Sequence, residues 1–165
     1  MATANLKTEN EILESKELRE ELLSRVEVLD KVKTLFLLPK LEMMTTQQVA
    51  DYYVVDVESV KKCYARNKLE FASDGAKKYT AKTIIERSGH FVPSVTTQTY
   101  KEFQLDENTV LRIPNPGVVL FPKRAVLRMG MLLRDSEIAK EVRTQLLNTF
   151  EEATPEQRTI QMSTE

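Results

Sequence analysis

The strongest structural signal in this chain lies at residues 45–68, TTQQVADYYVVDVESVKKCYARNK. Thr45, followed three residues later by Gln48, forms a capping-box pair, which predicts that a helix begins here. Asp56 is placed to cap a second helix from Val57. A very short turn is left between the two helices, and this arrangement predicts a helix-turn-helix.

The apolar residues of this stretch match the buried side of a twenty-residue helix-turn-helix frame that starts at Thr46. Six positions agree with the frame: Val49, Ala50, Tyr53, Val55, Val60 and Cys63. The ninth position is Val54, where the frame usually has Gly because the turn needs a positive φ. A β-branched residue tolerates that conformation badly, so we expect a turn that is one residue longer or differently shaped.

The second helix, predicted for residues 57–68, has a polar side opposite this apolar one, because residues three and four apart share a helix face. Lys62 and Arg66 are the best candidates for contacts with guanine edges or flanking phosphates. The predicted DNA-contacting set, which includes two lysines of the following segment, is Ser59, Lys61, Lys62, Arg66, Lys77 and Lys78. The alternative is that these cations form an ordinary solvated face.

Local charge favours a polyanionic partner, although the formal net charge of the chain is -1. Residues 60–90 contain eight Lys or Arg against three Asp or Glu. Such a local excess suits contacts with a phosphate backbone even in an acidic protein. We therefore expect double-stranded DNA as the partner and no membrane.

A small hairpin, or wing, is predicted directly after the second helix. The Asp74-Gly75 pair lies between short extended segments within residues 71–79, which is typical of a hairpin turn. Thr80 should then cap a short helix. Residues 41–90 are thus predicted to form a winged helix-turn-helix DNA-binding domain.

Residues 1–40 are predicted to hold one long helix, from about Asn10 to Phe36, that Pro39 ends. Arg25 interrupts an apolar stripe with spacings of four and three, which consists of Leu18, Leu22, Leu29, Val32 and Phe36. Two interpretations are open. The stripe packs on the following domain, or it pairs with a second copy in a coiled coil and makes a homodimer.

Residues 91–150 are expected to form a small α+β unit. Its antiparallel sheet should contain three strands, at residues 100–105, 110–113 and 118–121. Pro122 is placed to start one helix, and Asp135 to cap another that runs to residue 150. Residues 151–165 are predicted to form a flexible tail.

Composition favours a mostly helical α+β protein, because the 165 residues include only four Gly and six Pro. A single cysteine, Cys63, and a single histidine provide neither a disulfide nor a zinc site, and no catalytic triad is visible. We find no signal-peptide core and no stretch of the ~20 apolar residues that a membrane span needs. We expect a cytoplasmic protein that is not an enzyme and binds neither cofactor nor metal.

Two segments resemble known regulators. Residues 45–75 resemble the N-terminal helix-turn-helix of regulators from Gram-positive bacteria and their phages. Residues 116–148, PGVVLFPKRAVLRMGMLLRDSEIAKEVRTQLLN, resemble the closing part of the Bro-N and phage antirepressor family. The resemblance implies a strand, a helix and a final helix that carries Ser136, Ala139 and residues 142–147. It also implies DNA binding or regulation of phage and viral gene expression.

These observations favour a sequence-specific regulator of phage or mobile-element type that binds double-stranded DNA. The alternative is an antirepressor or inhibitor that binds a repressor or host protein through its C-terminal unit. That alternative predicts an apolar patch over residues 118–121 and the helices of residues 125–147, with the basic helix not exposed.

Overall fold

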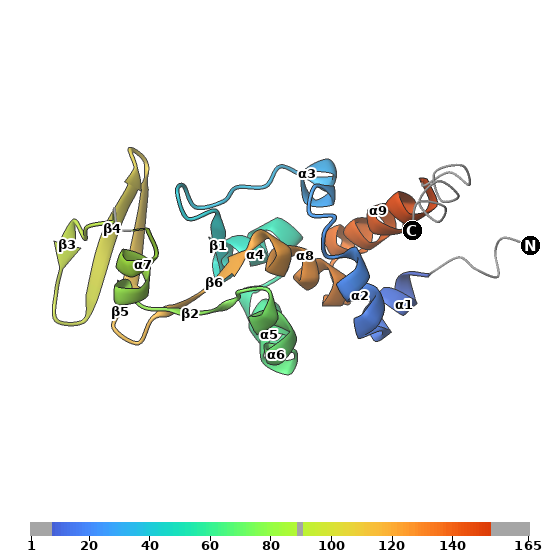
Figure 1. Cartoon of the computed structure of the whole chain (residues 1–165), viewed down its shortest axis with the longest axis horizontal. Helices are drawn as coiled ribbons and strands as arrows, with labels where there is room; N and C mark the ends of the chain where they lie inside the picture. The colour runs from blue at the N-terminus through green and yellow to red at the C-terminus, as the bar shows by residue number, and fades with distance from the viewer. Residues whose placement is uncertain (1–7, 89–90, 153–165) are drawn as a thin grey trace, which may run out of the picture.

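A computed structural model describes residues 8–88 and 91–152 of the chain. The fold is α+β, as predicted, with many short helices and two small antiparallel sheets. Figure 1 shows an elongated molecule, with one sheet at one end and most of the helices at the other. Of the predicted tail, Glu151 and Glu152 belong to the last helix, and residues 153–165 lie outside the described residues.

Three short helices occupy the region where the sequence predicted one long helix: α1 (Glu9–Glu14), α2 (Lys16–Leu22) and α3 (Val28–Val32). The single-helix prediction is therefore wrong. Ser15 breaks the helix because its backbone is extended and its hydroxyl accepts the N–H of Leu18 at 3.1 Å, which starts a new helix. A serine side chain competes for backbone hydrogen bonds in this way wherever it can act as an N-cap.

The apolar stripe of this region packs inside its own chain. Leu18, Leu22 and Leu29 are buried in the main core, whereas Phe36 is 73% exposed and lies well beyond the end of α3. Pro39 therefore ends no helix. The structure agrees with the interpretation that the stripe packs on the following domain. The described surface has no coiled-coil seam, because the leucines of the stripe are buried.

The middle of the chain contains the segments β1 (Met43–Thr45), α4 (Thr46–Tyr53), α5 (Val57–Arg66), α6 (Lys68–Ser73), β2 (Lys77–Tyr79) and α7 (Ala81–Ser88). Helices α4 and α7 lie where the sequence predicts them, and α5 begins at Val57 as predicted but ends at Arg66, before the predicted end at residue 68. Thr80 accepts the N–H of Thr83 at 3.2 Å at the start of α7, as expected for its cap. Neither β1 nor α6 was predicted.

The predicted hairpin wing at residues 71–79 is wrong. Phe71 belongs to α6, and Gly75 (φ 90°) ends that helix in a Schellman turn. In that turn the N–H of Gly75 donates to the Ala72 carbonyl at 2.9 Å, and the N–H of Ala76 donates to the Phe71 carbonyl at 3.1 Å. An Asp-Gly pair suits either a hairpin or this helix end, because both require a positive φ at the glycine.

The second half of the chain contains the segments β3 (Val95–Thr96), β4 (Tyr100–Asp106), β5 (Thr109–Pro114), β6 (Val118–Pro122), α8 (Lys123–Leu132) and α9 (Glu137–Glu152). One sheet has the order β3-β4-β5 and the other the order β1-β6-β2. The prediction that residues 118–121 join the strands of residues 100–113 in one sheet is therefore wrong. Gly117 (φ 97°) turns the chain away from β5, and β6 inserts between β1 and β2.

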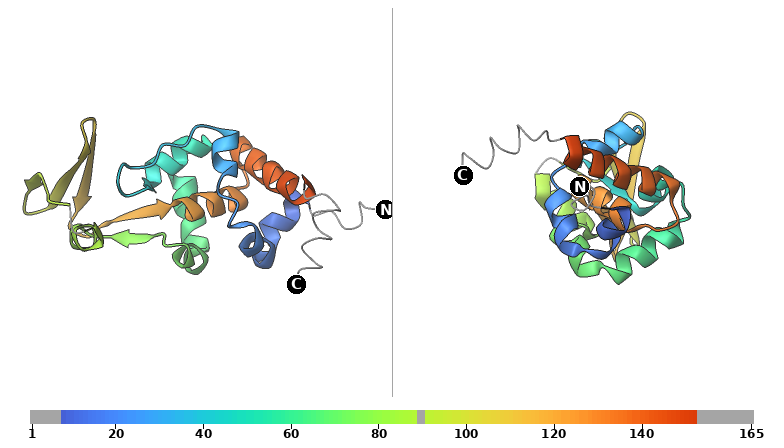
Figure 2. Two further views of the ribbon diagram at one scale, coloured as in Figure 1. Left: turned by 45° about the horizontal axis from the view of Figure 1, so that its top comes forward. Right: turned by 90° about the vertical axis from the view of Figure 1, so that its right-hand side faces the viewer.

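Sheet β1-β6-β2 lies between two hydrophobic cores. Successive residues of a strand point to opposite sides of the sheet. Met44 and Phe121 therefore belong to the main core, which is formed with α1–α6, α8 and α9. Met43 and Leu120 belong to a smaller core. That smaller core lies beneath α7 and sheet β3-β4-β5. Figure 2 shows most of the helices gathered around α8 on one side of β6, with the second sheet and α7 on the other.

Candidate nucleic-acid interface

The turn between α4 and α5 is short and tightly bonded. Val54 adopts the left-handed conformation, with φ 55° and ψ 50°. The N–H of Val55 donates to the Ala50 carbonyl at 3.0 Å, and that of Val54 donates to the Asp51 carbonyl at 3.3 Å, which is again a Schellman pattern. The expectation of a longer or reshaped turn is therefore wrong, because valine adopts the conformation that usually requires glycine.

Both helices begin as the sequence predicts. The N–H of Gln48 donates to the Thr45 hydroxyl at 3.1 Å, and the Gln48 side chain accepts the N–H of Thr45 at 2.8 Å. Asp56 accepts the N–H of Ser59 at 3.3 Å and its hydroxyl at 2.8 Å. These hydrogen bonds lower the pKa of Asp56, and they also engage the Ser59 hydroxyl that was predicted to contact DNA.

The inner side of the α4–α5 pair is buried in the main core. Val49, Ala50, Tyr53 and Val60 are fully buried, and Cys63 is 8% exposed. Tyr53 also fixes the pair to the C-terminal helices: its hydroxyl donates to the Val126 carbonyl at 2.6 Å, and its carbonyl accepts the Ser136 hydroxyl at 2.6 Å. Ser136, and not the predicted Asp135, caps α9 by accepting the N–H of Ala139 at 3.0 Å.

The outer side of α5 is exposed along its whole length. Its exposed residues follow the helical spacing, and they are Glu58, Lys61, Lys62, Ala65 and Arg66. Lys61 lies 3.6 Å from the Glu58 carboxylate, while Lys62 and Arg66 form no ion pair with any described residue. The helix thus presents free positive charge to solvent.

A groove runs along each flank of α5. The first, of about 590 Å³, is lined by Ser59, Lys62 and Arg66 of α5 and by Leu133 and Arg134 of the loop between α8 and α9. The second has a similar volume, and its lining includes Lys61, Lys78, Arg112, Val119 and Phe121.

Five of the six predicted contact residues therefore line one of the two grooves. Lys61 and Lys78 lie together in the second groove, and Ser59, Lys62 and Arg66 lie together in the first. Lys77 lines neither groove, since neighbouring residues of β2 point to opposite sides and its ammonium lies over the Tyr79 ring at 5.5 Å.

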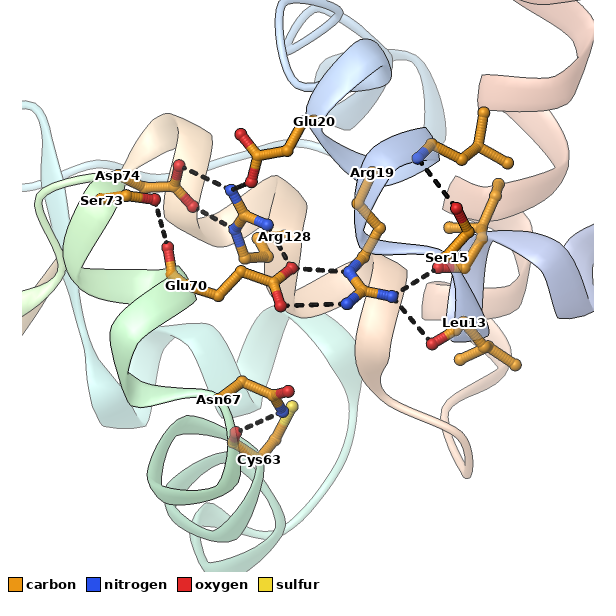
Figure 3. A network of polar contacts seen from close by, with 12 residues as sticks. Leu13, Ser15, Arg19, Glu20, Cys63, Asn67, Glu70, Ser73, Asp74 and Arg128 are labelled. Atoms are coloured by element: carbon orange, nitrogen blue, oxygen red, sulfur yellow. Dashed lines mark hydrogen bonds and ion pairs between the residues drawn. The ribbon is translucent and has the colours of Figure 1, made fainter.

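A buried ionic network supports the helix that follows α5 (Figure 3). Arg128 of α8 is fully buried and donates to Asp74 at 2.5 Å, to Glu20 at 2.7 Å and to Glu70. Glu70 also accepts two hydrogen bonds from Arg19 of α2, at 2.6 and 3.0 Å. The network therefore joins α2, α6 and α8.

The charged state of this network is stabilised by its own contacts. Burial alone raises the pKa of Glu70, but the hydrogen bonds and charges of Arg19 and Arg128 outweigh burial, so its pKa lies below the usual 4.5. Burial likewise lowers the pKa of Arg128, and the hydrogen bonds to Asp74 and Glu20 reverse this effect. Near neutral pH Glu70 and Arg128 are therefore both ionised, and their ion pair makes the network a structural support.

Cys63 has the properties of a core residue. Burial raises the pKa of its thiol to about 11, so the reactive thiolate is rare at neutral pH. Among the described residues, no group of three His, Cys, Asp or Glu could hold a metal ion. No helix in the described ranges is long and apolar enough to cross a membrane.

No protein-family model, curated protein or solved structure matches this chain. The resemblance to the Bro-N family therefore stays a prediction.

Sequence reasoning missed two features of this region. Arg134 joins Lys62 and Arg66 only because α8 and α9 pack against α4, and no local pattern signals such a long-range contact. Arg128 could have been noticed, because an arginine within the apolar run AVLRMGML needs buried carboxylates as partners.

Proposed function

We propose that this protein is a sequence-specific regulator that binds double-stranded DNA by inserting α5 into the major groove. The observation that carries the proposal is the two-sided character of α5. Its inner side is sealed by Val60 and Cys63, whereas its outer side exposes Lys61, Lys62 and Arg66. An α-helix held rigidly with one exposed cationic side is the element that most often enters the major groove.

Each exposed position of α5 suits a particular contact. Lys62 and Arg66, one turn apart and free of ion pairs within the described chain, suit guanine edges or phosphates. Glu58 lies near the start of the helix, where a carboxylate can accept from the amino group of cytosine. Ala65 exposes a methyl group that suits thymine.

The short turn supports the same function. Recognition by a helix needs that helix to be held at a fixed angle, and here the Schellman turn at Val54 and the bonds of Tyr53 to Val126 and Ser136 hold it. Glu70 and its arginine partners hold α6, which continues from α5. The backbone of α5 therefore has little conformational freedom to lose on binding.

The alternative is an antirepressor or inhibitor that binds a repressor or host protein. It predicts an apolar patch over residues 118–121 and the helices of residues 125–147, with the basic helix not exposed. In the part of the chain that the structure describes, no large hydrophobic residue of 118–147 is exposed and the basic helix is exposed, which favours DNA binding. The order β6, α8, α9 agrees with the arrangement that the Bro-N resemblance implies, which supports a regulator of phage or mobile-element type.

A salt titration of DNA binding tests the proposal. The double variant K62A/R66A should bind duplex DNA more weakly, and its plot of log affinity against log salt should be flatter by up to about 1.8, since each lost phosphate contact changes the slope by about 0.9. The matched control is K31A/K140A, which removes two exposed lysines, one from α3 and one from α9, that line neither groove beside α5. Equal affinities of K62A/R66A and wild type at every salt concentration would contradict the proposal.

A further inference from the structure

The two grooves beside α5 carry positive charge from elements far apart in the sequence. On one flank Lys62 and Arg66 are joined by Arg134 from the α8–α9 loop. On the other flank Lys61 is joined by Lys78 of β2 and Arg112 of β5. The cationic surface is thus wider than the helix and extends along both of its flanks.

Duplex DNA has phosphates at these two places when a helix occupies its major groove. The groove is about 12 Å wide, and a helix with its side chains is about 10 to 12 Å across, so a phosphate strand borders the helix on each side. We propose that the grooves flanking α5 each hold one phosphate strand, and that Arg134 and Lys78 are the phosphate contacts supplied from outside the helix. This inference rests on the proposed function and adds to it the phosphate contacts that come from outside α5.

Arg134 is held in place by contacts on both sides of its loop. The Arg143 guanidinium donates to the carbonyls of Gly130 at 2.9 Å and Leu133 at 2.6 Å, at the end of α8. Ser136 donates to the Tyr53 carbonyl, at the end of α4. The Arg134 side chain itself is exposed and forms no ion pair with a described residue. A free cation on a fixed loop beside α5 suits a backbone phosphate.

Lys78 is directed by the pairing of β2 with β6. It lies opposite Val119, and the turn at Gly117 approaches it so closely that a Cβ atom there would lie 3.0 Å from its Cγ. Its neighbour Lys77 points to the other side of the strand. The two adjacent lysines should therefore differ in function, although their sequence context is the same.

Nearby carboxylates limit the charge but do not cancel it. Asp135 lines the first groove, Glu58 lies 3.6 Å from Lys61, and Glu102 pairs with Arg112 at 2.7 Å. Arg112 also stacks on the Tyr100 ring at 4.0 Å. Of the groove cations that come from outside α5, Arg134 and Lys78 form no ion pair with a described residue, so the inference depends on these two.

Two pairs of single variants test the inference on the full chain. R134A and K78A should each lower the slope of log affinity against log salt by about 0.9, which corresponds to about eightfold weaker binding at 0.1 M salt. The loss should be equal for specific and random duplexes, because phosphate contacts carry no base information. The matched controls are R124A, an exposed arginine of α8 that lines neither groove, and K77A on β2.

The outcomes separate this inference from the proposed function. Wild-type slope and affinity in R134A and K78A, with intact binding by the parent chain, would overturn the two-strand arrangement and leave the function of α5 standing. A loss in K77A equal to that in K78A would overturn the assignment of the second groove. If R134A proves unstable, R134Q removes the charge with a smaller change of shape. Absence of binding by the parent chain to any duplex would refute the proposed function itself.

Discussion

Replacing Val54 by glycine should stabilise this protein. Val54 occupies the left-handed region, with φ 55° and ψ 50°, and its side chain is 70% exposed. The side chain thus contributes little burial while its β-branch crowds the backbone. At the end of α6 the same kind of turn uses Gly75, so the chain contains its own example of the less strained solution.

The size of the gain follows from two opposing effects. The left-handed conformation costs a residue with a Cβ about 1 to 2 kcal/mol, and V54G removes that cost. Glycine also raises the conformational entropy of the unfolded chain, and this reduces the gain in stability by about 0.4 to 1 kcal/mol. A net gain of about 1 kcal/mol remains, which for a chain of this size raises the melting temperature by about 2 to 4 °C.

Urea unfolding followed by circular dichroism measures this gain, with V54N and V55G as companions. Asparagine tolerates the left-handed region better than valine, so V54N should gain part of the stability. Val55 is half-buried and its φ is not positive, so V55G should lose stability. If V54G were no more stable than wild type while V55G behaved as expected, the claim of strain at this turn would be refuted.

Three further predictions concern the interior. R128M should destabilise the protein by about 3 to 5 kcal/mol, because it leaves the buried Asp74 carboxylate without its cation; a loss below about 1 kcal/mol in urea unfolding would contradict this. The pKa of Glu70 is lower in the folded state than its usual 4.5, so its contribution to stability is present above that pH and is lost as the pH falls below it. The unfolding free energy of wild type should therefore fall faster than that of E70Q between pH 5 and pH 3, and parallel curves would show that Glu70 is not responsible. G130A should cost about 1 to 3 kcal/mol, since its new methyl group would lie 2.5 Å from the Tyr53 hydroxyl oxygen, and an unchanged denaturation midpoint would mean that this contact relaxes freely.

Local signals predicted much of the middle of the chain. Capping side chains at Thr45, Asp56 and Thr80 marked three helix starts correctly, because a cap and the backbone N–H that it accepts are separated by only three residues. The spacing of apolar residues also identified the sealed side of α4 and α5. Both signals act within one or two turns of helix.

Features that depend on distant partners were not predictable in this way. Residues 118–121 are recognisable as a strand, but their place between β1 and β2 depends on segments about 75 and 40 residues earlier in the chain. In the sequence Ser15 looks like an ordinary helix residue. The helix break at Ser15 is accompanied by long-range contacts of Arg19, which donates to Glu70 and to two carbonyls of α1. The meeting of Arg134 with α5 has the same origin, so the full candidate interface emerges only from the packed structure.

The proposed function requires that α5 recognises duplex DNA. Selection of bound sequences from a pool of random duplexes at moderate salt tests it most directly, because affinity and sequence preference are read together. We predict repeated enrichment of one short motif by the wild-type chain and loss of that motif with K62A/R66A. A pool that stays as random as the control without protein would contradict the claim.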